Sequence, residues 1–194
     1  MGKLRTNGFT LIEVLISVLV LAIGVIGAAR MQLAALRTSQ QSAYQTAALQ
    51  LAAEMAEKIR ANQRQLASAG VANPYLSLDY KSSENTLTRP TVMCYTADCG
   101  SAELAKFDIY EWESRVKATL PGARVKICRD SKPWDSVAGA LVWSCAAQAE
   151  VANAPVIIKI GWLGKGVKPD GRAGVDSAQS FPPVIALAVD PYFR

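Results

Sequence analysis

The chain has 194 residues, of which 51% are hydrophobic and 19% charged, and its formal net charge is +5 at pH 7. This composition excludes a disordered chain, which combines low hydrophobicity with high net charge. The length suits one ordinary domain, or a small domain with an appendage. There is no histidine, so catalytic schemes with an imidazole base, such as Ser-His-Asp triads and HExxH zinc sites, are excluded.

Hydrophobic residues are concentrated near the N-terminus, between Phe9 and Ala29. Sixteen of these 21 residues are apolar, and the only charged one is Glu13. A helix that spans a bilayer needs about 20 apolar residues, so we expect this segment to cross a membrane. Lys3 and Arg5 precede it, and the positive-inside rule then keeps the short N-terminal end in the cytoplasm.

A secretory signal peptide and a plain single-pass anchor are the simpler interpretations of this run. The run is longer than the ~7–15 apolar residues of a signal peptide, and a lipoprotein is excluded because the first cysteine is Cys94. A plain anchor stays open, although a carboxylate inside a bilayer costs ~2.5–3.5 kcal/mol. No basic residue of the apolar run lies near Glu13. Its partner must therefore come from another chain or from a new N-terminus.

The segment Gly8-Phe9-Thr10-Leu11-Ile12-Glu13 resembles the class III signal of type IV prepilins and pseudopilins. That signal has a short basic leader, a glycine, an aromatic or apolar residue, a glutamate four residues later and a long apolar helix. The resemblance implies that a prepilin peptidase cleaves between Gly8 and Phe9 and methylates the new N-terminus at Phe9. It also implies that Glu13 pairs with the N-terminal ammonium of a neighbouring subunit during assembly. Removing one member of such a pair strands the other at a cost of several kcal/mol, so the pair can act as a check on register.

Helix-forming residues continue from Arg30 to about Gln65 without proline or glycine. Glu54 and Lys58 are spaced as a favourable i,i+4 pair. We expect one helix from about residue 10 to 65, with residues 9–29 as its transmembrane half and 30–66 as its periplasmic half. Five residues at helical spacing predict a stripe buried in a core: Tyr44, Ala48, Leu51, Met55 and Ile59.

The remaining residues, 67–194, predict a small periplasmic head. We expect a loop over residues 70–100 and a second helix over about 101–120, with Ser101 as its N-cap. Asp108, Glu111 and Glu113 look like the solvated face of that helix. Strands are predicted at Arg124–Arg129, Val156–Trp162 and Val184–Val189. The expected fold is therefore α+β, with a small antiparallel sheet laid on the long N-terminal helix. The pilin resemblance implies the same fold.

The four cysteines are Cys94, Cys99, Cys128 and Cys145. In a domain outside the cytoplasm they should be oxidised, and three connectivities are possible. The local pairs Cys94–Cys99 and Cys128–Cys145 are favoured. A four-cysteine zinc site is the alternative, and it fits poorly because the spacing lacks CxxC-like pairs.

Three further stretches are similar to the PilV type of minor pilin of the type IV pilus. They are AALQLAAEMAEKIRAN, CGSAELAKFDIYEW and the sheet segments VKICRD and VIIKIGW. This resemblance implies a low-abundance subunit of the inner membrane that joins other minor pilins and the major pilin. Together they would prime pilus assembly and sit near the tip, and so support adhesion and twitching motility. A minor pseudopilin of a type II secretion system shares the leader and the fold and remains the alternative.

Two other function classes are disfavoured. A membrane-anchored periplasmic enzyme would need a site, and the glycine-rich segment 161–166 lacks the spacing of a phosphate-binding loop. We therefore expect no catalytic residue, cofactor, metal or small-molecule substrate.

DNA binding is suggested only by the basic loop residues Lys165, Lys168 and Arg172. No aromatic residues are interleaved there, so no nucleic-acid partner is expected.

Overall fold

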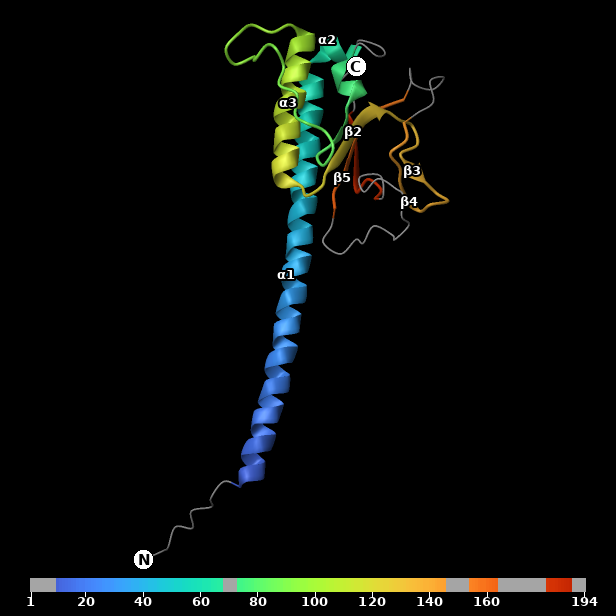
Figure 1. Ribbon diagram of the computed structural model, residues 1–194. Coiled ribbons are helices and arrows are strands. Elements are labelled where there is room, and N and C mark those ends of the chain that lie inside the picture. The colour runs from blue at the N-terminus through green and yellow to red at the C-terminus, as the bar shows by residue number, and fades with distance from the viewer. Residues whose placement is uncertain (1–9, 68–72, 146–153, 164–180, 190–194) are drawn as a thin grey trace, which may run out of the picture. The chain divides into compact units, whose positions relative to one another are not determined.

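The computed structural model describes residues 10–67, 73–145, 154–163 and 181–189 (Figure 1). The chain divides into two compact units, residues 1–43 and residues 44–194, which we call the N-terminal and the C-terminal unit. Helix α1, Leu11–Ala61, has residues in both units. Gly8 and Phe9 lie outside the described residues, as does the basic loop at 165–172.

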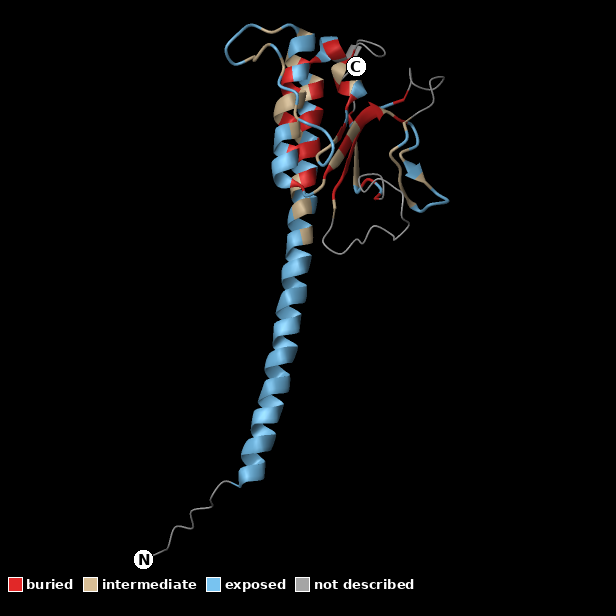
Figure 2. Ribbon diagram, viewed as in Figure 1, coloured by how far each residue is buried: buried red, intermediate tan, exposed pale blue. Residues whose placement is uncertain are grey.

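Helix α1 accounts for nearly all of the described part of the N-terminal unit. The first turn forms on Thr10, whose carbonyl accepts hydrogen bonds from the backbone N–H groups of Glu13 and Val14. The helix then continues without interruption through Gly24 and Gly27. Its most apolar window has a mean hydropathy of 2.7, and none of that window is buried (Figure 2). In length and composition this part of α1 suffices to cross a membrane.

In the C-terminal unit, α1 packs against a second long helix, α3, Ser101–Thr119 (Figure 1). The predicted stripe is confirmed: Ala48, Leu51, Met55 and Ile59 are buried, and Tyr44 packs against them. The tryptophan of α3, Trp112, is fully buried and donates its indole N–H to the carbonyl of Leu51, at 2.8 Å. The two helices are therefore held together by apolar packing and by directed bonds such as this one.

The long helix ends earlier than its composition predicts. It stops at Ala61, and a short helix α2, Gln63–Ala67, follows. The intervening Asn62 is buried, and its side-chain amide donates to the carbonyl of Ser101, at 2.7 Å. Asparagine is a weak helix former because its amide competes for backbone groups. Here the competing partner belongs to the start of α3.

The N-cap of α3 is Gly100 and not Ser101 as predicted. Glu103 accepts a hydrogen bond from the backbone N–H of Gly100, at 2.9 Å, and so satisfies a group that the helix leaves open. Ser101 is already helical, and its hydroxyl lies 3.5 Å from the side-chain oxygen of Gln65. The helix ends before Pro121-Gly122, and Gly122 adopts a positive φ of 54°, which favours glycine.

The sheet has four antiparallel strands in the order β1-β2-β5-β6. Their bounds are Asp79–Lys81, Arg124–Arg129, Val156–Gly161 and Ile185–Val189. The three longer strands match the predicted ones closely. The region expected to be a loop also contains a 3-10 helix, Pro74–Ser77, and β1. A two-stranded hairpin, β3 Trp134–Asp135 and β4 Ala140–Leu141, was not predicted either. These pieces are too short to show a period in the sequence.

One face of the sheet supplies the core against the helices. Val125, Ile127, Ile158 and Ile160 are fully buried there and belong to the same cluster as Trp112. The strand β5 is buried on both faces, over all six of its residues. This α+β arrangement, a long N-terminal helix on a small antiparallel sheet with a second helix, is the fold expected from the sequence.

Candidate assembly site

The acidic residue of the N-terminal unit is Glu13, in the first turn of α1. Its side chain is exposed and forms no hydrogen bond or ion pair within the described residues. Ser17 donates its hydroxyl to the backbone carbonyl of Glu13, at 2.7 Å. That bond satisfies the serine inside the helix and leaves the carboxylate open to another molecule.

Glu13 is surrounded by apolar side chains that are also exposed. Leu11 is 82% exposed, Ile12 67% and Val14 51%, and large apolar residues remain exposed along the helix as far as Leu36. Burying apolar surface is worth about 25 cal/mol per Å², so water is a poor environment for this length of helix. Lipid or other apolar helices must cover it.

In the C-terminal unit the four cysteines form two disulfides, Cys94–Cys99 and Cys128–Cys145. These are the two local pairs that the sequence favoured. No free cysteine remains, so the thiolates of the alternative zinc site are absent. The longer of the two loops, residues 128–145, contains the β3–β4 hairpin and begins on the central strand β2.

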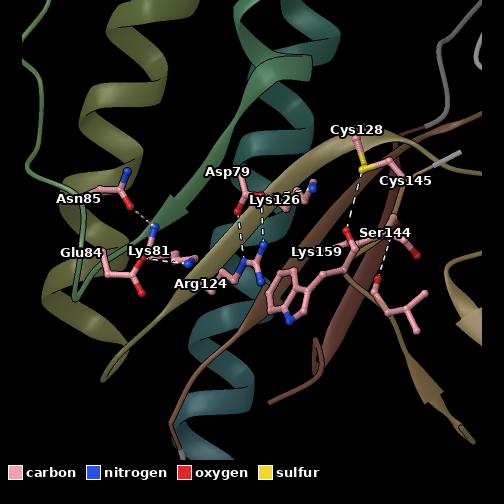
Figure 3. Close-up of polar contacts among 12 residues, drawn as sticks. Asp79, Lys81, Glu84, Asn85, Arg124, Lys126, Cys128, Ser144, Cys145 and Lys159 are labelled. Carbon is pink, nitrogen blue, oxygen red and sulfur yellow. Dashed lines mark hydrogen bonds and ion pairs between the residues drawn. A yellow bond between two sulfur atoms is a disulfide. The ribbon is translucent and has the colours of Figure 1, made fainter. Parts of the chain in front are cut away.

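Lys159 of β5 holds the loop between Cys128 and Cys145 against the sheet (Figure 3). The Lys159 ammonium is fully buried and lies 2.5 Å from the carboxylate of Asp130. It also donates to the carbonyls of Val142, at 2.8 Å, and of Ser144. All three N–H groups of the ammonium thus have an acceptor. The sequence signal for this site is one lysine within an apolar strand, and sequence reasoning missed it.

A second polar cluster joins α1 to α3. Lys58 lies 2.7 Å from the carboxylate of Asp108, which also accepts a hydrogen bond from the Tyr75 hydroxyl, at 2.8 Å. Burial raises the pKa of Tyr75, and the negative charge of Asp108 adds to the effect. Asp108 is only 6% exposed, so its prediction as part of a solvated face was wrong.

The predicted pair of Glu54 with Lys58 is also absent. Each side chain instead reaches α3, where Glu54 pairs with Arg115 and Lys58 with Asp108. An i,i+4 pair on a helix surface is worth only about 0.2–0.5 kcal/mol. Partners supplied by a packed neighbouring helix therefore replace it readily.

A third cluster fixes the edge of the sheet. Arg124 makes two hydrogen bonds to Asp79, both 3.1 Å, and Lys126 lies 3.2 Å from the same carboxylate (Figure 3). Burial alone would raise the pKa of Asp79, but Arg124 and Lys126 outweigh it and hold the pKa below its usual range. The guanidinium of Arg124 also lies over the ring of Trp143, 4.6 Å from its centre, a favourable cation–π geometry.

Comparison with known families gives two matches, which lie end to end along the chain. Residues 3–29 match the prokaryotic N-terminal methylation motif, and residues 30–110 match the Tt1218-like family, described as type IV pilin Tt1218. No curated protein and no solved structure matches the chain. The methylation motif implies processing by a prepilin peptidase, and with the apolar helix it is consistent with anchoring in the inner membrane before incorporation into a pilus. The motif, the family match and the α+β fold agree, so the chain is similar to Tt1218-like type IV pilins over residues 30–110 and carries a class III prepilin methylation motif at its N-terminus.

Proposed function

We propose that this chain is a type IV pilin, and specifically a minor pilin of the PilV type, which joins other minor pilins in a complex that primes pilus assembly and sits near the tip. The observation that carries the assembly role is the exposed carboxylate of Glu13, at the start of an apolar helix that is itself exposed. The subtype is supported by the similarity of the helix and sheet segments named above. Adhesion and twitching motility would follow from the assembled fibre.

The proposal assigns a role to each part of the chain. Residues 1–8 are the leader that the peptidase removes between Gly8 and Phe9, and residues 9–29 span the inner membrane. Residues 30–66 continue the helix into the periplasm, and residues 67–194 form the periplasmic head. This topology places both disulfides in an oxidising compartment, where they form and persist.

The physical role of Glu13 is to pair with the N-terminal ammonium at Phe9 of a neighbouring subunit. Opposite charges attract far more strongly in a low-dielectric environment than in water. A subunit in the wrong register would leave both charges without a partner, at a cost of several kcal/mol. The pair therefore selects one axial position among many that the apolar surface alone would permit.

Intact mass spectrometry of the protein purified from membranes tests the processing. The mature chain should begin at Phe9 and carry one added methyl group. The same protein from cells without prepilin peptidase should retain residues 1–8. A chain that begins at Met1 in cells with active peptidase would contradict the pilin role.

Affinity purification of the full chain from solubilised membranes tests the choice of system. Co-purification of the major pilin and other minor pilins supports the pilus role. Recovery of the components of a type II secretion system would instead assign the chain to a pseudopilus, and would overturn the PilV-type proposal while keeping the processing.

A further inference from the structure

A cavity of about 320 Å³ lies in the C-terminal unit between strand β1 and helix α3. Tyr80 of β1 and Ile109, Tyr110 and Glu113 of α3 contribute to its walls, with the loop at 85–90 closing one side. The volume is at the small end of the range of ligand pockets. It is large enough for one amino-acid side chain or a small organic molecule.

Two polar groups at this cavity lack a partner. Tyr80 is 2% exposed, and its hydroxyl forms no hydrogen bond within the described part of the chain. Glu113 is half-buried and, among the same residues, forms no hydrogen bond or ion pair. The negative charge of Glu113 adds to the effect of burial in raising the pKa of Tyr80, so the two groups are electrostatically coupled. Buried polar groups without partners are rare in folded proteins, and each calls for an explanation.

The other charged groups of the cavity do not neutralise Glu113. Asp79 also lines it, but Arg124 and Lys126 already balance that carboxylate. Lys106 lines the cavity as well. It precedes Glu113 by seven residues on α3, which is about 10 Å along a helix axis, and no ion pair joins the two side chains. Glu113 is thus the acid of the cavity wall that has no cation beside it.

We propose that this cavity binds an organic cation, an alkylammonium or guanidinium group, with Glu113 as its counter-ion and Tyr80 and Tyr110 beside it. A cation would supply the charge that the half-buried carboxylate lacks. It would also be attracted by the electron-rich faces of aromatic rings. An anion would meet Glu113 as a like charge, and a neutral ligand would leave the carboxylate uncompensated. The cation comes either from a lysine or arginine side chain of another protein subunit or from a free amine.

The test uses the full chain in detergent micelles, with carbon-13 in the carboxyl groups of its glutamates. The probes are n-butylammonium, n-butylguanidinium and the neutral n-butanol, and the variant Glu113→Gln identifies the Glu113 signal. Burial raises the pKa of Glu113 to about 7 in the free protein. A bound cation stabilises the ionised carboxylate, so the titration midpoint should fall when either cation is added. We expect both cations to bind with a Kd of about 1 mM or tighter.

Glu113→Gln should weaken the binding of n-butylammonium by about tenfold or more, because it removes the counter-ion. Glu111→Gln is the matched control, since Glu111 lies on the same helix but does not line the cavity. Thermal unfolding of both variants checks that the fold is kept. The proposal is overturned if n-butanol binds as well as the ammonium, if Glu113→Gln retains the affinity, or if the midpoint of Glu113 does not move.

Two peptides distinguish the sources of the cation. A lysine flanked by glycines is compared with the same peptide carrying norleucine, which has no charge. If the lysine peptide binds about tenfold more tightly than n-butylammonium, the cavity receives a side chain of another subunit. If the two bind equally, a free amine is the ligand. If the norleucine peptide binds as tightly as the lysine peptide, the charge does not contribute to binding, and the proposal of a cation site is contradicted for both sources.

Discussion

Lys159 and Asp130 form a buried ion pair on the face of the sheet opposite to the helices, with 2.5 Å between ammonium and carboxylate. Asp130 belongs to the loop closed by Cys128–Cys145, and the Lys159 ammonium of β5 also donates to two carbonyls of that loop. The covalent bond therefore joins the ends of the loop, while Lys159 fixes its interior to the central strand. A single polar side chain in this way determines how the outer face of the sheet is covered.

The variant Lys159→Met should destabilise the C-terminal unit by about 3–5 kcal/mol, because it leaves the carboxylate of Asp130 buried without a counter-ion. Urea unfolding of the full chain in micelles measures this loss. Tryptophan fluorescence is a suitable signal, since all four tryptophans lie in residues 44–194.

Lys126→Met is the matched control for that measurement. Lys126 also pairs with an aspartate, Asp79, but its side chain is 25% exposed, and such pairs contribute about 0–1 kcal/mol. The double variant Lys159→Met/Asp130→Leu should recover part of the lost stability, since it removes the stranded charge. Equal losses for Lys159→Met and Lys126→Met would disprove the anchoring role of Lys159.

The two disulfides should contribute unequally to stability. In the chain-entropy model, the loop closed by Cys128–Cys145 stabilises the fold by about 3 kcal/mol and the shorter loop of Cys94–Cys99 by about 2 kcal/mol. Replacing each pair by serines and comparing the urea midpoints checks the order. Removal of Cys128–Cys145 should cost more, and the reverse order would show that loop length does not govern these bonds.

Stability should fall as the pH rises through the range in which Glu113 ionises. Burial raises the pKa of Glu113 from 4.5 to about 7. Between these values the folded chain holds a proton that the unfolded chain has lost, so increasing pH favours unfolding. Once the pH exceeds 7, the carboxylate is ionised in both states and the full penalty applies.

Glu113→Gln should remove this dependence and stabilise the protein at pH 8 by about 1–2 kcal/mol, a modest figure because solvent screens part of the carboxylate. The measurement is the difference in unfolding free energy between variant and wild type at pH 5 and pH 8. Glu111→Gln again serves as the control. A difference that does not grow from pH 5 to pH 8 would contradict the assignment.

Glu13→Ala should insert into the membrane normally but be incorporated into fibres at least about tenfold less than the wild type, because the variant cannot form the proposed charge pair with the neighbouring N-terminus. Immunoblots of purified fibres and of membranes measure the two quantities. Ser17→Ala, one helical turn away, should incorporate normally, since the Ser17 hydroxyl bonds only to its own helix. Normal incorporation of Glu13→Ala would rule out the pairing role.

Local patterns were sufficient to predict the long helix, the second helix and the three longer strands. Each of these elements is long enough to repeat its period, as the stripe from Tyr44 to Ile59 does. The N-terminal signal could also be recognised from the sequence, because Glu13 and the apolar run around it are neighbours in the chain. The cysteine pairs favoured for their short spacing are also the pairs that the structure contains.

The partners of the charged side chains were decided by the tertiary structure alone. Glu54 and Lys58 exchange their expected pairing for partners on α3, because a cross-helix contact competes with a local pair worth only a few tenths of a kcal/mol. Burial of Asp108, Lys159 and Glu113 depends on which segments cover them. Those segments are far apart in the sequence, so a local sequence pattern cannot predict that they cover these side chains. The sequence by itself determined which elements form and how the N-terminus is marked for processing. Only the packing of these elements determined which charges are buried. It therefore also determined where Lys159 attaches the loop 128–145 to the sheet and where the C-terminal unit has a cavity.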